Sequence, residues 1–277
     1  MNWIERTFRL GAFLAYLFFL IALPFMVIWG WIGFLLSLPI DAVAIYWLRV
    51  CGYRSIRSRL GAEGASWGDR PAIQHAVSEI ARRLGIRVPE LVIKKSGSHN
   101  IGCFGFSPNR AAIVVTPSVL EVPRDELLAL VAREMVEIKS FRAGVRSWFA
   151  QFVAVVDRMI GSHRGRQSLP FRLFLKEAIV WPATLIPVWC LLVRGAENEL
   201  DQEALRIAGV SPLVLATGYR RIELESGRVP LEIPVDLRGL FLMPPRFEES
   251  LVKSMFPAES LASRVVRLEQ LWRSAAV

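Results

Sequence analysis

One stretch decides the fold: Pro123-Arg124-Asp125-Glu126-Leu127-Leu128-Ala129-Leu130-Val131-Ala132-Arg133-Glu134-Met135-Val136-Glu137-Ile138-Lys139-Ser140. Proline followed by two acidic residues is typical of a helix start, because acidic side chains oppose the positive end of the helix dipole. The apolar residues recur at helical spacing, and Glu134 falls inside their arc. A carboxylate there is costly unless it is paired, protonated or functional. Arg133 and Glu137 lie together at the edge of the arc, where a salt bridge is the simplest interpretation.

The sequence around this helix predicts a compact α+β unit, split by an insertion. Apolar residues at helical spacing predict a helix over 70–84, and Gly85 supplies its C-terminal stop. Two short runs rich in β-branched residues, 90–95 and 111–116, predict strands. The segment 98–110 between them has room for one further strand and a turn.

The N-terminal region carries a long apolar run. Leu10 to Leu48 is about twice the ~20 residues that one spanning helix requires, so we expect a transmembrane hairpin. Trp29-Gly30-Trp31 near its middle suits a tight turn at the far interface. Arginines precede the run and follow it over 49–59, which predicts that both of its ends are cytoplasmic. A buried helical pair in a soluble protein is the alternative.

A second apolar zone is shorter. Trp148–Ile160 is too short to cross a membrane, and Ile179–Val193 contains two prolines, with a basic loop over 163–168 between them. We expect membrane-surface helices here rather than an inserted hairpin. The predicted organisation is a membrane hairpin (1–50), a first part of the core (51–140), a membrane-associated helical insertion (141–193) and a C-terminal part of the core (194–277).

Composition excludes some classes of function. The formal net charge of +9 comes largely from arginines beside apolar segments, which suits anionic lipid headgroups. Nucleic-acid binding is not expected, because no aromatic-interleaved basic motif accompanies the charge. Cys51, Cys103 and Cys190 are widely spaced, which predicts neither disulfides nor a cysteine-based metal site, but buried side chains in a reducing compartment.

The order of the segments resembles the HtpX-type membrane zinc metalloproteases, which are related to the CAAX prenyl proteases. The resemblance rests on Leu84–Ile93, His99–Gly105, Ala112–Leu120 and Arg124–Ala132, and it spans nearly the whole chain. It implies a mostly helical, gluzincin-type core with a small β-sheet, an N-terminal transmembrane hairpin and a second apolar pair. In this family a His-Glu-x-x-His helix and a later glutamate bind zinc.

The resemblance assigns a role to each matching residue. Glu134 matches the catalytic glutamate, whereas Arg133 and Glu137 stand where the two zinc-binding histidines belong. Glu197 matches the third zinc ligand, and Asp201 matches the carboxylate that supports it. The strand over the substrate cleft would contain His99, Asn100, Ile101 and Gly102. A C-terminal match covers Phe256-Pro257 and Arg264–Leu268, with phenylalanine in place of the family's histidine.

These departures predict that no zinc is bound. Zinc at such a site relies on imidazole, and Arg133 would add a permanent positive charge. We expect its guanidinium to bridge Glu134, Glu137 and Glu197 instead. None of the histidines, His75, His99 and His163, has ligand spacing with another. A site rescued by His99 and carboxylates would favour Mn or Mg, and zinc, as in the family, is the alternative cofactor.

Three functions are compatible with the sequence. We favour a catalytically inactive membrane pseudoprotease that binds a peptide or partner protein. The first alternative is an active membrane metalloendopeptidase in membrane-protein quality control with an atypical metal set. The second is a structural subunit of a membrane complex. All three predict a multi-pass membrane protein with a cytoplasmic core domain, in a bacterial inner membrane.

Overall fold

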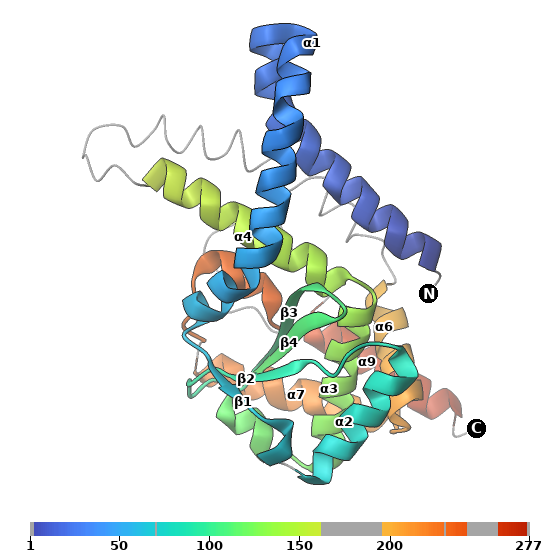
Figure 1. Cartoon of the computed structure of the whole chain (residues 1–277). Coiled ribbons are helices and arrows are strands. Elements are labelled where there is room, and N and C mark those ends of the chain that lie inside the picture. Colours follow the sequence, from blue (N-terminus) through green and yellow to red (C-terminus); the bar gives the residue numbers. More distant parts are fainter. Residues whose placement is uncertain (1–2, 70, 162–195, 230, 243–259, 276–277) are drawn as a thin grey trace.

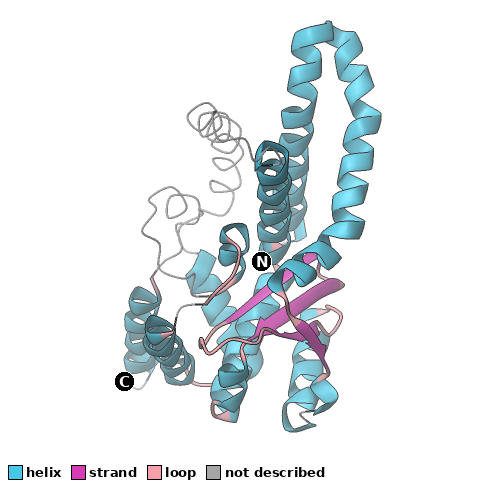
Figure 2. Ribbon diagram, turned by 90° about the vertical axis from the view of Figure 1, so that its left-hand side faces the viewer, coloured by secondary structure: helices cyan, strands magenta, loops and turns pink. Residues whose placement is uncertain are grey.

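The computed structural model describes residues 3–69, 71–161, 196–229, 231–242 and 260–275. Figures 1 and 2 show a helical hairpin rising from a domain in which helices surround a small sheet. The described part of the chain is mostly helical with one mixed sheet, so the predicted α+β class is confirmed.

Helix α1 (Trp3–Leu60) forms the hairpin. It is broken at Gly30, whose φ of 58° and ψ of −136° suit only glycine, and its two halves then run back alongside each other (Figure 2). The predicted turn at Trp29-Gly30-Trp31 is therefore confirmed. Among the residues described, no helix has both the length and the apolar character that crossing a membrane demands.

The sheet has four strands in the order β1-β2-β4-β3. They are β1 (Glu63–Ala65), β2 (Glu90–Ile93), β3 (Ile101–Ser107) and β4 (Arg110–Val115). β2 and β4 are parallel, whereas β1 and β3 pair antiparallel with β2 and β4. The two predicted strands are confirmed within a few residues, and the segment between them supplies β3. β1 was not predicted, because Glu-Gly-Ala carries no strand signal.

The helices close around this sheet. They are α2 (Pro71–Leu84), α3 (Arg124–Lys139), α4 (Arg142–Gly161), α6 (Ala196–Ala208), α7 (Pro212–Arg228) and α9 (Leu261–Ala275), with the short 3₁₀ helices η1 (Trp67–Asp69), η2 (Pro117–Glu121) and η3 (Val235–Leu240). Gly85 has a φ of +64° and ends α2 as predicted. Pro123 is the cap before α3 rather than its first residue.

Alternation along β2 and β4 sends side chains into two apolar clusters. Leu91 and Ile113 face the larger cluster with α2, α3, α6, α7 and α9, while Val92 and Val114 face a smaller one with α1, α4 and η3. The latter face is covered by α4, so Trp148 is buried. The 148–160 stretch is helical as predicted, whereas 163–168, 179–193 and Cys190 lie outside the described residues.

Helix α3 occupies the middle of the larger cluster and contacts the sheet and four helices, α2, α4, α6 and α7. Nearly every residue from Glu126 to Ile138 is buried. Arg133 and Glu137, which lie at the edge of the apolar arc, form the expected ion pair and are buried as well. Their side chains are 2% and 0% exposed, because the surrounding elements cover α3 on all sides.

Candidate functional site

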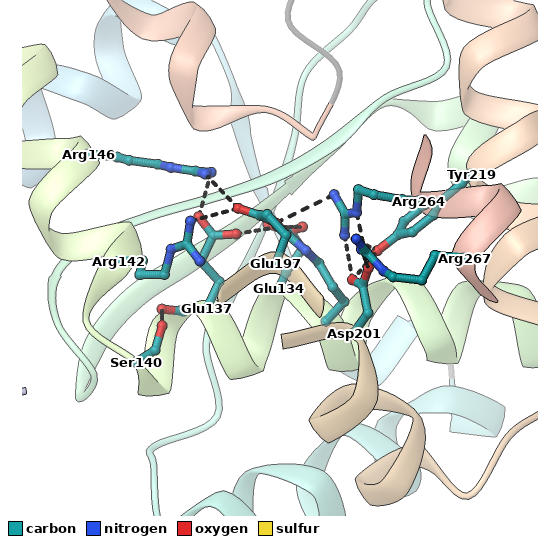
Figure 3. A network of polar contacts seen from close by, with 11 residues as sticks. Glu134, Glu137, Ser140, Arg142, Arg146, Glu197, Asp201, Tyr219, Arg264 and Arg267 are labelled. Carbon is teal, nitrogen blue, oxygen red and sulfur yellow. Dashed lines mark hydrogen bonds and ion pairs between the residues drawn. The ribbon is translucent and has the colours of Figure 1, made fainter. Parts of the chain in front are cut away.

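A charged cluster is buried between α3, α4, α6 and α9 (Figure 3). We call it the Arg/Glu cluster. It contains three glutamates and four arginines: Arg133, Glu134 and Glu137 from α3, Arg142 and Arg146 from α4, Glu197 from the first turn of α6, and Arg264 from α9.

Arg133 lies among three carboxylates. Its Nη1 is 2.6 Å from Glu134 Oε1 and also contacts Glu137 Oε2, while Nη2 is 2.8 Å from Glu197 Oε2. The Arg133, Glu134 and Glu137 side chains are at most 2% exposed, and that of Glu197 is 13% exposed. A single guanidinium thus joins the carboxylates at the position of the catalytic glutamate and at two zinc-ligand positions that the family resemblance implies.

Glu197 is where the arginines converge. Its Oε1 accepts a hydrogen bond from Arg142 Nη2 at 2.6 Å and lies 3.7 Å from Arg146 Nη2. Its Oε2 lies 3.6 Å from Arg264 Nη1. Arg146 Nη1 also contacts Glu137 Oε1 at 2.5 Å, so each of these two glutamates faces more than one arginine.

Burial and charge shift the pKa values of the glutamates in different directions. Burial raises the pKa of Glu134, and the neighbouring Glu137 adds to this although Arg133 opposes it. Burial would also raise the pKa of Glu137, but Arg133 and Arg146 outweigh it and the pKa falls. In the same way the arginines outweigh burial at Glu197 and hold its pKa well below the ordinary value. Glu137 and Glu197 are therefore ionised, whereas ionised Glu134 is disfavoured.

Asp201 forms a second buried group next to the cluster. Tyr219 donates a hydrogen bond to Asp201 Oδ1 at 2.7 Å, and Arg264 Nε donates to Oδ2 at 3.0 Å. The Arg264 guanidinium also lies 4.4 Å from the centre of the Tyr219 ring. Arg264 also approaches Glu197, so the Asp201 group and the Arg/Glu cluster together hold α9 against α6 and α7. Figure 3 shows the side chains of the two groups next to each other.

Cys103 of β3 was predicted to be a buried side chain without a metal role. It is 1% exposed, but potential ligand atoms of Cys103, Glu134 and Glu137 lie within 4.8 Å of one another. Zinc would need a thiolate, yet burial and then Glu134 raise the pKa of this thiol well above its ordinary value. Arg133 also contacts both glutamates. With that guanidinium in place, this donor set does not fit zinc.

The predicted cleft strand is covered at its start. Ile101 and Gly102 open β3, and the backbone N–H of Leu242 donates to Ile101 O at 2.8 Å. Gly102 forms a bridge with Phe241, and a side chain at Gly102 would overlap the backbone of Leu240. The edge over the Arg/Glu cluster is thus paired with the segment 240–242 of the chain itself.

The two residues before β3 lie in different surroundings. Asn100 is buried, with its side-chain oxygen accepting from the N–H of Ile101 at 3.0 Å. Burial and then Arg221 lower the pKa of His99, and Glu225 and Glu126 are its other charged neighbours. His99, which we expected nearest to the site, therefore faces charges outside the cluster.

The structure describes only some of the other residues that the sequence analysis named. His75 is exposed on α2. His163 and Phe256-Pro257 lie outside the described residues. The sequence analysis did not predict that Arg142 and Arg146 belong to the site. Their spacing of four residues could have indicated it, because it places both arginines on one face of a helix.

The fold and the site define a class: an α+β protein whose helices bury an Arg/Glu cluster next to a small mixed sheet. Comparisons with known proteins name the family. The chain is 28% identical to a Protease HtpX homolog of Salinibacter ruber over 274 residues, which is 96% of this chain and 98% of the relative.

Proteins of the same name from Thermodesulfovibrio yellowstonii and Nostoc sp. are 22% and 26% identical over 80% and 91% of this chain, and over 82% and 92% of their own lengths. No family model matches, and no solved structure matches. These relatives align over most of the chain and support its place in the HtpX-type family.

Proposed function

We propose that this chain is a membrane-anchored pseudoprotease, in which a buried ion-pair cluster replaces the zinc site and the fold serves to bind a peptide or partner protein. The observation that carries the proposal is the contact of Arg133 with Glu134, Glu137 and Glu197. These carboxylates stand where the family resemblance implies the catalytic glutamate and two zinc ligands.

Electrostatic magnitudes favour the guanidinium over a metal ion. A divalent cation about 4 Å from Arg133 would be repelled by roughly 8 kcal/mol at an effective dielectric constant of about 20. Structural zinc sites bind with an apparent free energy of about 10–16 kcal/mol, and they do so with thiolate and imidazole ligands. The repulsion from Arg133 thus cancels the attraction of one carboxylate at the same distance, and Arg142, Arg146 and Arg264 would oppose the attraction of the others.

The state of Glu134 supports the same conclusion. A catalytic glutamate of this kind must take a proton from a water that a metal ion has activated. Here one oxygen of Glu134 accepts a hydrogen bond from Arg133 at 2.6 Å, and the carboxyl is buried. This oxygen is therefore occupied by Arg133 rather than free to face a metal-bound water.

One observation favours the active alternative. The proximity of Cys103, Glu134 and Glu137 offers three ligand atoms, as an atypical metal site would require. Such a site would need Arg133 to swing away and Cys103 to lose its proton. The metal content of the protein distinguishes this enzyme from the pseudoprotease.

The membrane anchor is part of the proposal and rests on the hairpin. The run Leu10–Leu48 is long enough for two spans. On either side of the turn, large apolar side chains are exposed, among them Val27 (78%), Trp31 (77%) and Tyr46 (68%). Such a patch on a soluble surface would be unfavourable, whereas lipid tails would cover it. The arginines after the hairpin would then lie at the headgroups, with the core on the cytoplasmic side of a bacterial inner membrane.

The test uses the full chain purified in detergent. We expect zinc well below one ion per chain by elemental analysis, and labelled denatured casein that is retained but not cleaved. Stoichiometric zinc, or casein cleavage that a chelator abolishes and Glu134→Gln removes, would establish the enzyme instead. Co-purification of one partner at a fixed ratio, without casein binding, would favour the structural subunit.

A further inference from the structure

The charges of the buried groups do not balance. The Arg/Glu cluster holds four arginines and three glutamates. Buried Asp201 and the 25% exposed Arg267 lie 3.5 Å apart, join it through Arg264 and add one charge of each sign. With Arg267 counted, the described group carries one excess positive charge when all its members are ionised, and two when Glu134 is protonated. Buried charge is costly unless it is paired.

Most of the cluster's buried N–H groups that lack a hydrogen-bond partner in the described part of the chain lie on α4, and Nε of Arg133 on α3 is the other. The Arg142 side chain is 5% exposed, and among the described residues its one hydrogen bond runs from Nη2 to Glu197. Its Nε and Nη1 are buried without a hydrogen-bond partner in the described part of the chain, as is Nε of Arg146. Leaving a buried donor unsatisfied costs about 1–3 kcal/mol, and more for a charged group. These spare donors are the least satisfied part of the cluster.

The two arginines are arranged to act together. They lie one helical turn apart on α4, and in Figure 3 both guanidinium groups reach the same end of Glu197. The Arg146 contact with Glu197, at 3.7 Å, is too long for a hydrogen bond. Arg146 and Glu197 are each 13% exposed, so solvent reaches the cluster on this side.

The charges around Arg142 also leave its positive charge only partly compensated. Burial lowers its pKa, and Glu197 offsets this only in part because Arg146 and Arg133 repel the charge. A further negative group would relieve this imbalance.

We propose that Arg142 and Arg146 form an oxyanion-binding site, whose ligand is a carboxylate or phosphate group. Guanidinium forks suit both groups, since each presents two or more oxygens to parallel N–H donors. The group can come from free phosphate or from the carboxylate of a bound peptide. This site does not depend on whether the protein is inactive as a protease.

The first test is the unfolding temperature of the dialysed full chain in detergent, with phosphate titrated against chloride at constant ionic strength. We expect the temperature to rise with the logarithm of the phosphate concentration. The rise should be lost in Arg142→Gln and, should that variant fail to fold, in Arg146→Gln. Arg82→Gln is the matched control, because that arginine is 75% exposed on α2 and pairs only locally with Glu79.

The second test separates the two sources. A short peptide with a free C-terminal carboxylate should bind about tenfold or more tightly than its amidated form, because a charge-assisted hydrogen bond is at stake. Phosphate should compete with it. A response to phosphate alone assigns the site to a free anion. The proposal is overturned if neither phosphate nor the peptide has a larger effect than chloride. It is also overturned if Arg142→Gln and Arg146→Gln respond as the wild type does. In either case the spare donors would bind only water.

Discussion

Replacing Arg133 with alanine is the most direct test of the Arg/Glu cluster. The substitution removes a guanidinium that is 2% exposed and leaves Glu134, Glu137 and Glu197 without their shared partner. Breaking a buried ion pair in this way costs about 3–5 kcal/mol. For a domain of this size 1 kcal/mol corresponds to about 2–4 °C, so the melting temperature should fall by about 6–20 °C.

The assay is thermal unfolding of the full chain in detergent, with one scan rate for all variants because such unfolding is often irreversible. Arg220→Ala is the control. Arg220 is 54% exposed and pairs with Glu269, and surface pairs contribute about 0–1 kcal/mol. An Arg133→Ala protein that melts within the range of this control would refute the claim that the guanidinium holds the cluster together.

Three further predictions concern single groups, and a fourth concerns metal. Glu134→Gln should leave the melting temperature unchanged or raise it, because burial raises the pKa of this carboxyl and makes its ionised form unfavourable; a loss above ~1 kcal/mol would contradict this. Lowering the pH below about 4.5 should destabilise the protein, because the pKa of Glu197 in the fold is well below that value and its stabilisation is lost as the carboxylate becomes protonated; Glu197→Gln should show a flatter dependence of melting temperature on pH. Gly102→Ala should cost about 1–3 kcal/mol in urea unfolding, since its side chain would overlap the segment that crosses the strand. The double variant Arg133→His with Glu137→His should bind zinc in elemental analysis where the wild type does not, and a wild type that already holds one zinc per chain would disprove the ion-pair replacement.

Local pattern determined much of what could be predicted. The turn at Gly30, the end of α2 at Gly85, two strands and helix α3 follow from glycine conformation, β-branched runs and helical spacing, which act over a few residues. The unusual position of Glu134 was also visible, because a carboxylate interrupts an apolar arc. The order of these segments was enough to indicate the family.

Only the tertiary structure decided what surrounds Glu134. On the helical wheel Arg133 and Glu137 lie only at the edge of the apolar arc, but six other elements bury α3, and no periodicity within one helix reveals that. Cys103, Arg142 and Arg146 come from β3 and α4, and their approach to Glu137 depends on how those elements cross. The charge balance of the cluster is a sum over these separate segments. Sequence therefore determined which groups are unusual, and packing determined which charges they meet.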